Sequence, residues 1–297
     1  MIQFIIDVIL RSCDLILIAV GMSAIYSLMK FPNIALTQYA VAGALLSIAL
    51  QKSGVPIAVS VVVACGATII LATFLNEYIF NPMLKISSST AMIGSLAVSM
   101  LLSAVFLVMV GPNPARFNTA VLKPLKLFGV RVTELQLYSV GITVTALIMF
   151  ALLLYKTDLG RCVRATSTNA LLADATGIDT RKSKSVVVAL SALLASLGGI
   201  TLALKGEVSM QTGTEMLLPV FSAAILGGLG NPLGAIVGAL VIATAETLIT
   251  NINFGPLTGQ SLYFLPAAYA SAASFLLLVA TLLWRPRGIF VNEVKRV

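Results

Sequence analysis

Long stretches without a single charged residue constrain the fold of this chain more than any other feature. The uncharged stretches cover residues 31–51, 53–76, 86–115, 135–155, 185–204, 216–245 and 247–284. Most of them reach the roughly 20 apolar residues that a helix needs to cross a lipid bilayer. Hydrophobic residues make up 59% of the chain, more than the core of a water-soluble protein of 297 residues can bury. The sequence therefore predicts a polytopic membrane protein.

The apolar stretches favour helices over strands as the spanning elements. A membrane β-barrel would show short segments of alternating apolar and polar residues, whereas these stretches are apolar on every side. We predict an all-α fold of roughly 8 to 9 transmembrane helices, some short or discontinuous, in a single transmembrane domain over residues 1–297. The expected spans are residues 15–29, 34–50, 56–75, 91–110, 135–155, 186–204, 233–250 and 262–284.

Basic residues in short loops predict the orientation of the spans, because such loops stay on the cytoplasmic side. The loop 156–185 and the tail 285–297 are both rich in Lys and Arg, so both are expected inside. An even number of crossings must then separate them, whereas only three clear spans lie between. We therefore expect the apolar segment 216–226 to supply a fourth crossing as a short, tilted or discontinuous helix. The loop 111–134 falls outside by this argument, although it carries four basic residues.

Several kinds of chemistry have no readable motif in the sequence. It lacks a G-x-x-x-x-G-K-[ST] loop that would cradle phosphates, so we expect any ATP to be used by a partner and not by this chain. The chain has no His and its three Cys lie far apart, so neither a metal site nor a catalytic residue is predicted. We attribute the net charge of +8 to contact with anionic lipid headgroups and not to a nucleic-acid partner.

The loop TDLGRCVRATSTNALLADATGIDTRKSK, residues 157–184, is a polar stretch between two apolar ones. Asn169 is placed to cap a short helix at its start, and Gly177 is placed to end it in a left-handed conformation. By composition alone, this is an amphipathic helix whose basic residues lie at lipid headgroups.

Four stretches, taken in order, resemble a known family. LGRCVRATSTNALLADATGIDTRK, followed by LSALLASLGGI, resembles the cytoplasmic coupling segment of permease subunits in bacterial ABC importers of the branched-chain amino acid (LivH/LivM) family. PNIALTQYAVAGAL, AAILGGLGNPLGAIVGALVIATAETL and the ending RPRGIF are similar to further parts of these permeases. The chain departs from them at Leu36, Thr37 and Gln38, where the amino-acid permeases often have His, Gly and Glu. This departure affects which solute the chain would transport and not which family it resembles.

The resemblance implies a permease subunit of an ATP-driven importer in the bacterial inner membrane, with its C-terminus in the cytoplasm. Its partners would be ABC ATPase subunits that use ATP and Mg, an external solute-binding protein, and a second permease chain, which the family pattern makes a paralogue. The solute would be a branched-chain amino acid or a related small compound. The residues expected to couple to the ATPase are Arg161, Arg164, Asn169, Ala170, Ala173, Asp174 and Gly177. Among them, the two Arg would contact acidic residues of the ATPase, and Ala170, Ala173 and Asp174 would form the docked face.

The Gly-rich helix in the last third of the chain combines small residues with one acid. Its small residues are Gly234 and Gly238, in a G-x-x-x-G pair, and Ala235, Ala239 and Ala243, each four residues apart. Such residues let two helices approach closely, so we expect this helix to pack against a neighbour. Glu246 lies on the same face, turned away from lipid. A buried acid suggests a function, but Glu246 can equally cap the helix end or pair with an Arg.

Polar side chains within the spans are candidates for the translocation pathway. They are Asn33, Thr37, Gln38, Ser95 and Glu246. Asn33 can instead cap the helix that follows it, and Ser95, one turn from Ser99, can instead bond to a neighbouring helix. The scarcity of charge inside the spans favours a neutral, zwitterionic or apolar solute over an ion.

Two other classes of function remain open from the sequence. An ion-coupled secondary transporter of a small neutral solute would use Glu246 for coupling and would need a second buried acid, for which the sequence offers no convincing candidate. A membrane assembly protein that transports nothing would tolerate disruption of the helix at 169–176. The resemblance favours the ATP-driven permease over both.

Overall fold

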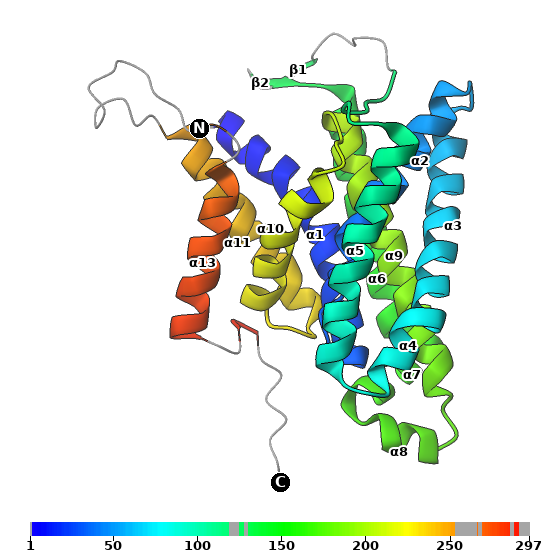
Figure 1. The fold of residues 1–297 in the computed structure, drawn as a ribbon. Helices are drawn as coiled ribbons and strands as arrows, with labels where there is room; N and C mark the ends of the chain where they lie inside the picture. The colour runs from blue at the N-terminus through cyan, green and yellow to red at the C-terminus, as the bar shows by residue number, and fades with distance from the viewer. Residues whose placement is uncertain are drawn as a thin grey trace.

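The computed structural model describes residues 2–118, 125–127, 130–252, 266, 269–285 and 288–290. The described helices form a bundle through which α1 (Ile2–Met29) runs obliquely (Figure 1). The other helices are α2 (Leu36–Lys52), α3 (Ile57–Leu75), η1 (Asn76–Phe80), α4 (Asn81–Leu84), α5 (Ser88–Val110), α6 (Glu134–Lys156), α7 (Asp158–Thr168), α8 (Ala170–Ala175), α9 (Thr180–Lys205), α10 (Thr212–Gly227), α11 (Pro232–Asn251) and α13 (Ala270–Trp284). Two short strands, β1 (Leu125–Leu127) and β2 (Val130–Val132), pair antiparallel at the end opposite α8 (Figure 1).

The helices confirm the predicted all-α polytopic membrane fold. Within the described ranges, five helices are long and apolar enough to cross a membrane: Ile57–Leu84, Ser88–Val110, Glu134–Lys156, Thr180–Lys205 and Pro232–Asn251. The first of these joins α3, η1 and α4 into one helix, in which the π-helical η1 forms a local widening. The 28-residue α1, the 17-residue α2 and the shorter apolar helices α10 and α13 also belong to the bundle.

The bundle has a buried centre and an apolar outside. In the most apolar 18-residue stretch of α9, 67% of the residues are buried inside the protein. The corresponding share is 28% in the α3–α4 helix and in α5, and 17% in α6. α9 also approaches α2 so closely that a Cβ on Gly199 would overlap the backbone carbonyl of Ala40. The exposed faces of α3, α5 and α6 are lined by large apolar side chains such as Val62, Ile93 and Ile148, as contact with lipid requires.

The short helix predicted from the crossing argument is present as α10. It has 16 residues, Thr212–Gly227, and contains Pro219, which cannot donate a backbone hydrogen bond within the helix. Together with α9, α11 and α13, α10 makes four described helices between the basic loop 156–185 and the basic tail, the even number that the predicted orientation requires. Accordingly, α8 and residues 288–290 lie at the same end of the bundle (Figure 1).

The structure differs from the predicted spans mainly at the two ends of the chain. The first helix begins at Ile2 and not near residue 15, because its polar residues find partners within the protein, as described below. The predicted last span, 262–284, lies partly outside the described residues, and the described helix there is α13, from Ala270. The basic tail after residue 290 also lies outside them.

Candidate functional site

The polar segment between α6 and α9 forms two helices, α7 and α8, at one end of the bundle (Figure 1). As predicted, the Asn169 side chain caps α8: its Oδ1 accepts a hydrogen bond from the Leu172 backbone N–H at 3.1 Å. Gly177 follows α8 with φ +85°, the left-handed conformation expected from the sequence. The preceding helix, α7, was not predicted as a separate element, and it is capped by Thr157.

The exposed side of α8 carries two large apolar side chains. Leu171 is 83% exposed and Leu172 is 63% exposed, whereas Ala173 is buried against its own chain. We expected Ala173 on the docking face, and in this structure the short helix turns this small residue toward its own chain. Asp174 stays exposed, and its Oδ1 accepts a 3.4 Å bond from the Thr180 backbone N–H. The surface that remains for a partner is therefore formed by Leu171, Leu172 and Asp174, with Ala170 half-buried.

The two arginines of α7 already have contacts within the chain. Arg161 pairs with Asp158 at 3.2 Å, one turn earlier in the same helix. Arg164 donates to the carbonyl oxygen of Leu154, and its guanidinium carbon lies 5.6 Å from the centre of the Tyr155 ring. Both Arg side chains are nevertheless exposed, so they remain open to an acidic partner. At the start of α9, the backbone N–H of Lys182 donates to Asp179 and lowers the pKa of that exposed carboxyl.

The Gly-rich helix α11 packs its small residues directly against α10. A Cβ on Gly234 would overlap the carbonyl oxygen of Gly227, and a Cβ on Gly238 would overlap that of Ala223. Ala235, Ala239 and Ala243 are fully buried on the same helix. The turn between the two helices is capped by Asn231, whose Oδ1 accepts from two backbone N–H groups of α11. The G-x-x-x-G pair thus lies where two backbones touch.

The pathway candidates on α2 and α5 are buried side by side. The Oδ1 of Asn33 accepts from the Ala35 N–H at 3.1 Å just before α2, and the Thr37 hydroxyl donates to the Ile34 carbonyl at 3.2 Å. The Ser95 hydroxyl of α5 accepts from the Ile34 N–H at 3.1 Å, so this serine bonds to the neighbouring segment. Gln38 is fully buried, and among the described residues neither atom of its amide has a hydrogen-bond partner.

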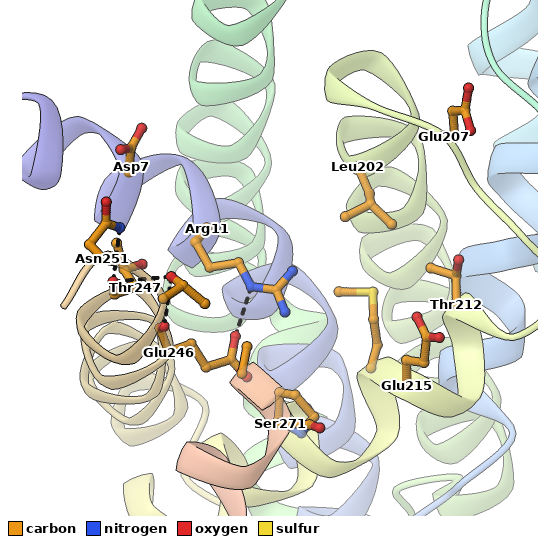
Figure 2. Close-up of a pocket in the computed structure, with 14 residues that line it drawn as sticks. Asp7, Arg11, Leu202, Glu207, Thr212, Glu215, Glu246, Thr247, Asn251 and Ser271 are labelled. Atoms are coloured by element: carbon orange, nitrogen blue, oxygen red, sulfur yellow. Dashed lines mark hydrogen bonds and ion pairs between the residues drawn. The ribbon is translucent and has the colours of Figure 1, made fainter. Parts of the chain in front are cut away.

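The fifth pathway candidate, Glu246, is paired with an arginine. Arg11 of α1 donates from Nε to Glu246 Oε2 at 2.7 Å, and the Ser274 hydroxyl of α13 donates to Oε1 at 2.5 Å. Only 2% of Glu246 is exposed. Figure 2 shows this pair at the wall of a cavity of about 650 Å³ lined by α1, α9, α10, α11 and α13. Of the alternatives left open by the sequence, pairing with an Arg is the one found.

A second buried acid was missed by the sequence analysis. Asp14 of α1 is 2% exposed, and Lys205 at the end of α9 donates to its Oδ2 at 2.7 Å. The Thr201 hydroxyl donates to Oδ1 at 3.0 Å. The sequence offered no convincing candidate for a second buried acid, and the structure shows that Asp14 is one. Asp7, Arg11 and Asp14 are spaced four and three residues apart, so a helical face could have been recognised from the sequence.

Both buried acids are neutralised by a base of the same chain, and both pairs anchor α1 to another helix. Asp14 links α1 to α9, and Arg11 links it to α11. A coupling acid for an ion would have to bind and release its ion, whereas these two carboxylates are already occupied by cations. The pairs therefore support a structural role for the polar face of α1.

Comparisons with known proteins agree with this architecture. A family model described as the permease component of branched-chain amino acid transport systems matches residues 4–282. A Methanocaldococcus jannaschii protein described as a "probable branched-chain amino acid transport permease protein LivH" is 31% identical over 95% of this chain and 90% of its own length. The high-affinity branched-chain amino acid transport permease LivH of Salmonella typhimurium is 25% identical over 95% and 92%. The structure of PsaBC from Streptococcus pneumoniae superposes with a TM-score of 0.51 at 14% identity, covering 96% of this chain and 93% of that one, so it shows the fold alone.

Proposed function

We propose that this chain, which belongs to the family of permease components of ABC-type branched-chain amino acid transport systems, moves a branched-chain amino acid into the cell. Its relatives are transport permease subunits. In this proposal, an external binding protein delivers the solute, and ATPase subunits bind and hydrolyse ATP with Mg. The chain acts as a single transmembrane domain of the inner membrane and pairs with a second permease chain, a paralogue.

The observation that carries the coupling part of the proposal is the apolar surface of α8. Leu171 and Leu172 are exposed on α8, and α8 contacts α7, the helix that carries the exposed Arg161 and Arg164. Large exposed apolar side chains beside charges are typical of a protein contact. We assign this end to the cytoplasm, together with residues 288–290. Closure of the ATPase dimer would then pull on α7 and α8 and shift the bundle between outward- and inward-facing arrangements.

The docking surface can be tested by the double substitution Leu171→Ser, Leu172→Ser. Full burial of a leucine contributes about 1.5–3 kcal/mol, so we expect retention of the ATPase to fall by at least about tenfold. The measurement is affinity purification of the chain from its native membrane in mild detergent, with mass spectrometry of the bound subunits. Ile86→Ser is the control, because Ile86 is 77% exposed in the turn before α5, outside the α7–α8 segment. Equal retention in both variants would refute docking through α8.

The end of α8 offers a second test, Gly177→Val. A β-branched residue at φ +85° costs roughly 1–3 kcal/mol, so α8 would lose its position relative to α9. We expect ATP-driven leucine uptake to fall while the variant still reaches the membrane. Gly206→Val is the matched control, because Gly206 has an extended backbone (φ −162°) and a Cβ there would meet open space. Full uptake in the Gly177 variant would contradict the coupling role.

A further inference from the structure

The cavity beside the Arg11–Glu246 pair is lined by the N-terminal parts of α1, α10 and α13 and the C-terminal parts of α9 and α11. These helix ends lie at the end of the bundle opposite α8 (Figure 1). The cavity volume of about 650 Å³ falls within the roughly 300–1,000 Å³ typical of pockets for small molecules. The lining combines two kinds of surface. Leu202, Met216 and Pro219 supply an apolar wall, and the remaining lining is mostly charged or polar.

One cation faces several carboxylates across this cavity. Arg11 uses Nε for its bond to Glu246, and its two terminal nitrogens point into the cavity (Figure 2). Three of the four carboxylates that line it have partners: Asp7 accepts from Gln3 at 3.0 Å, Glu207 lies 3.7 Å from Arg116, and Glu246 bonds Arg11. The fourth, Glu215 of α10, forms no side-chain hydrogen bond or ion pair within the part of the chain that the structure describes.

We infer that this cavity binds the free amino acid as a zwitterion on its way through the protein. The terminal nitrogens of Arg11 bind the α-carboxylate, since a guanidinium presents donors in the geometry that a carboxylate accepts. Glu215 accepts from the α-ammonium group, and the wall formed by Leu202, Met216 and Pro219 receives the aliphatic side chain. The inference rests on the proposed function and adds where the solute binds.

The arrangement selects against other small solutes. An aliphatic amine would leave the terminal nitrogens of Arg11 without an anion, and an aliphatic carboxylate would approach Glu215 with a like charge. A zwitterion satisfies both groups at once. Acidic side chains outnumber basic ones in the lining, so the cavity does not hold an amino acid tightly by its carboxylate. Transport requires such transient binding, because the solute must also leave the site.

The first test is the maximal rate of radiolabelled L-leucine uptake by cells that carry the complete transporter. Glu215→Gln removes the charge that receives the ammonium group, and we expect a rate about tenfold lower, as for loss of one charged hydrogen bond. KM should stay unchanged, because the external binding protein sets it. The control is Glu134→Gln, the same change in the first turn of α6, outside the cavity. Equal rates in the two variants would overturn the inference.

A test of Arg11 as a solute-binding residue requires a variant in which α1 and α11 stay connected. In the double variant Arg11→Gln, Glu246→Gln, two neutral amides can still hydrogen-bond across the same gap, but the guanidinium is gone. We expect uptake to fall about tenfold while the melting temperature in detergent stays close to that of the unmodified protein. Normal uptake would show that Arg11 only holds the helices together.

Direct occupancy can be measured by chemical protection. Thr212 lines the cavity, so Thr212→Cys, in a chain whose Cys13, Cys65 and Cys162 are replaced by Ser, places a thiol there. L-leucine should slow its reaction with a membrane-impermeant thiol reagent in the intact complex, whereas 3-methylbutylamine and 4-methylpentanoate should not. Equal protection by all three, or none by leucine, would overturn the inference. If leucine fails to protect while uptake is normal, only the inference falls, whereas absence of leucine uptake in the unmodified complex removes the proposed function as well.

Discussion

Replacing Asp14 by alanine is expected to destabilise the bundle by about 3–5 kcal/mol, because it leaves the ammonium group of Lys205 buried without its partner. Lys205 is only 13% exposed, and its remaining acceptor is the carbonyl oxygen of Leu10 at 2.6 Å. The measurement is the melting temperature in detergent, followed by the amount of folded protein on size-exclusion chromatography. A melting temperature unchanged by Asp14→Ala would show that the pair is not needed for folding.

The partner substitution separates loss of a pair from loss of packing. In the double variant Asp14→Leu, Lys205→Leu, neither charge is buried, because leucine has the branched shape of aspartate and nearly the volume of lysine without a charge. Such replacements are often neutral or stabilising, so we expect most of the lost stability to return. If the double variant is as unstable as Asp14→Ala, then the network with Thr201 depends on the carboxylate itself and not on the balance of charges.

Replacing Gly238 by leucine is expected to separate α10 from α11. A Cβ at this position would overlap the carbonyl oxygen of Ala223, and it would lie 2.8 Å from the backbone nitrogen of Gly227. Both obstacles are backbone atoms, which cannot move aside as a flexible side chain would. Overpacking of this kind costs about 3 kcal/mol, and here the helices must also move apart. We expect a lower melting temperature and loss of leucine uptake.

Gly141→Leu is the matched control for this substitution. Gly141 lies in α6, where a Cβ would meet no atom within 4 Å, so the same change adds a side chain on an open surface. We expect its stability and uptake to equal those of the unmodified protein. Comparable losses in the two variants would show that the added helix side chain acts generally, and that close packing of α10 on α11 is not the cause.

The loop between α6 and α9 shows how far local sequence signals reach. Asn169 and Gly177 predicted the start and end of α8, because capping and left-handed turns depend on a few neighbouring residues. The exposed face of α8 was not predicted. Ala173 turns inward and Leu171 outward because α8 packs against α7 and α9, and the residues of α8 alone do not show how these three helices pack together.

The polar face of α1 likewise combines residues that the sequence shows with contacts that only the folded protein shows. Its three charged residues, Asp7, Arg11 and Asp14, were visible in the sequence, but their partners were not. Arg11 meets Glu246 across 235 positions and Asp14 meets Lys205 across 191 positions. Since the predicted span began only at residue 15, these charges were left outside the membrane core.

Bilayer thickness requires a minimum apolar length from each spanning helix, so the sequence alone predicts the class of fold, the order of the apolar helices and the short helix that is α10 in the structure. It also determined that Gly234 and Gly238 allow close packing. The folded protein was needed to show which helix packs there, which bases neutralise the buried acids, and that Arg11 and Glu215 line one cavity. These features depend on how whole helices pack together, and neighbouring residues in the chain carry no information on that arrangement.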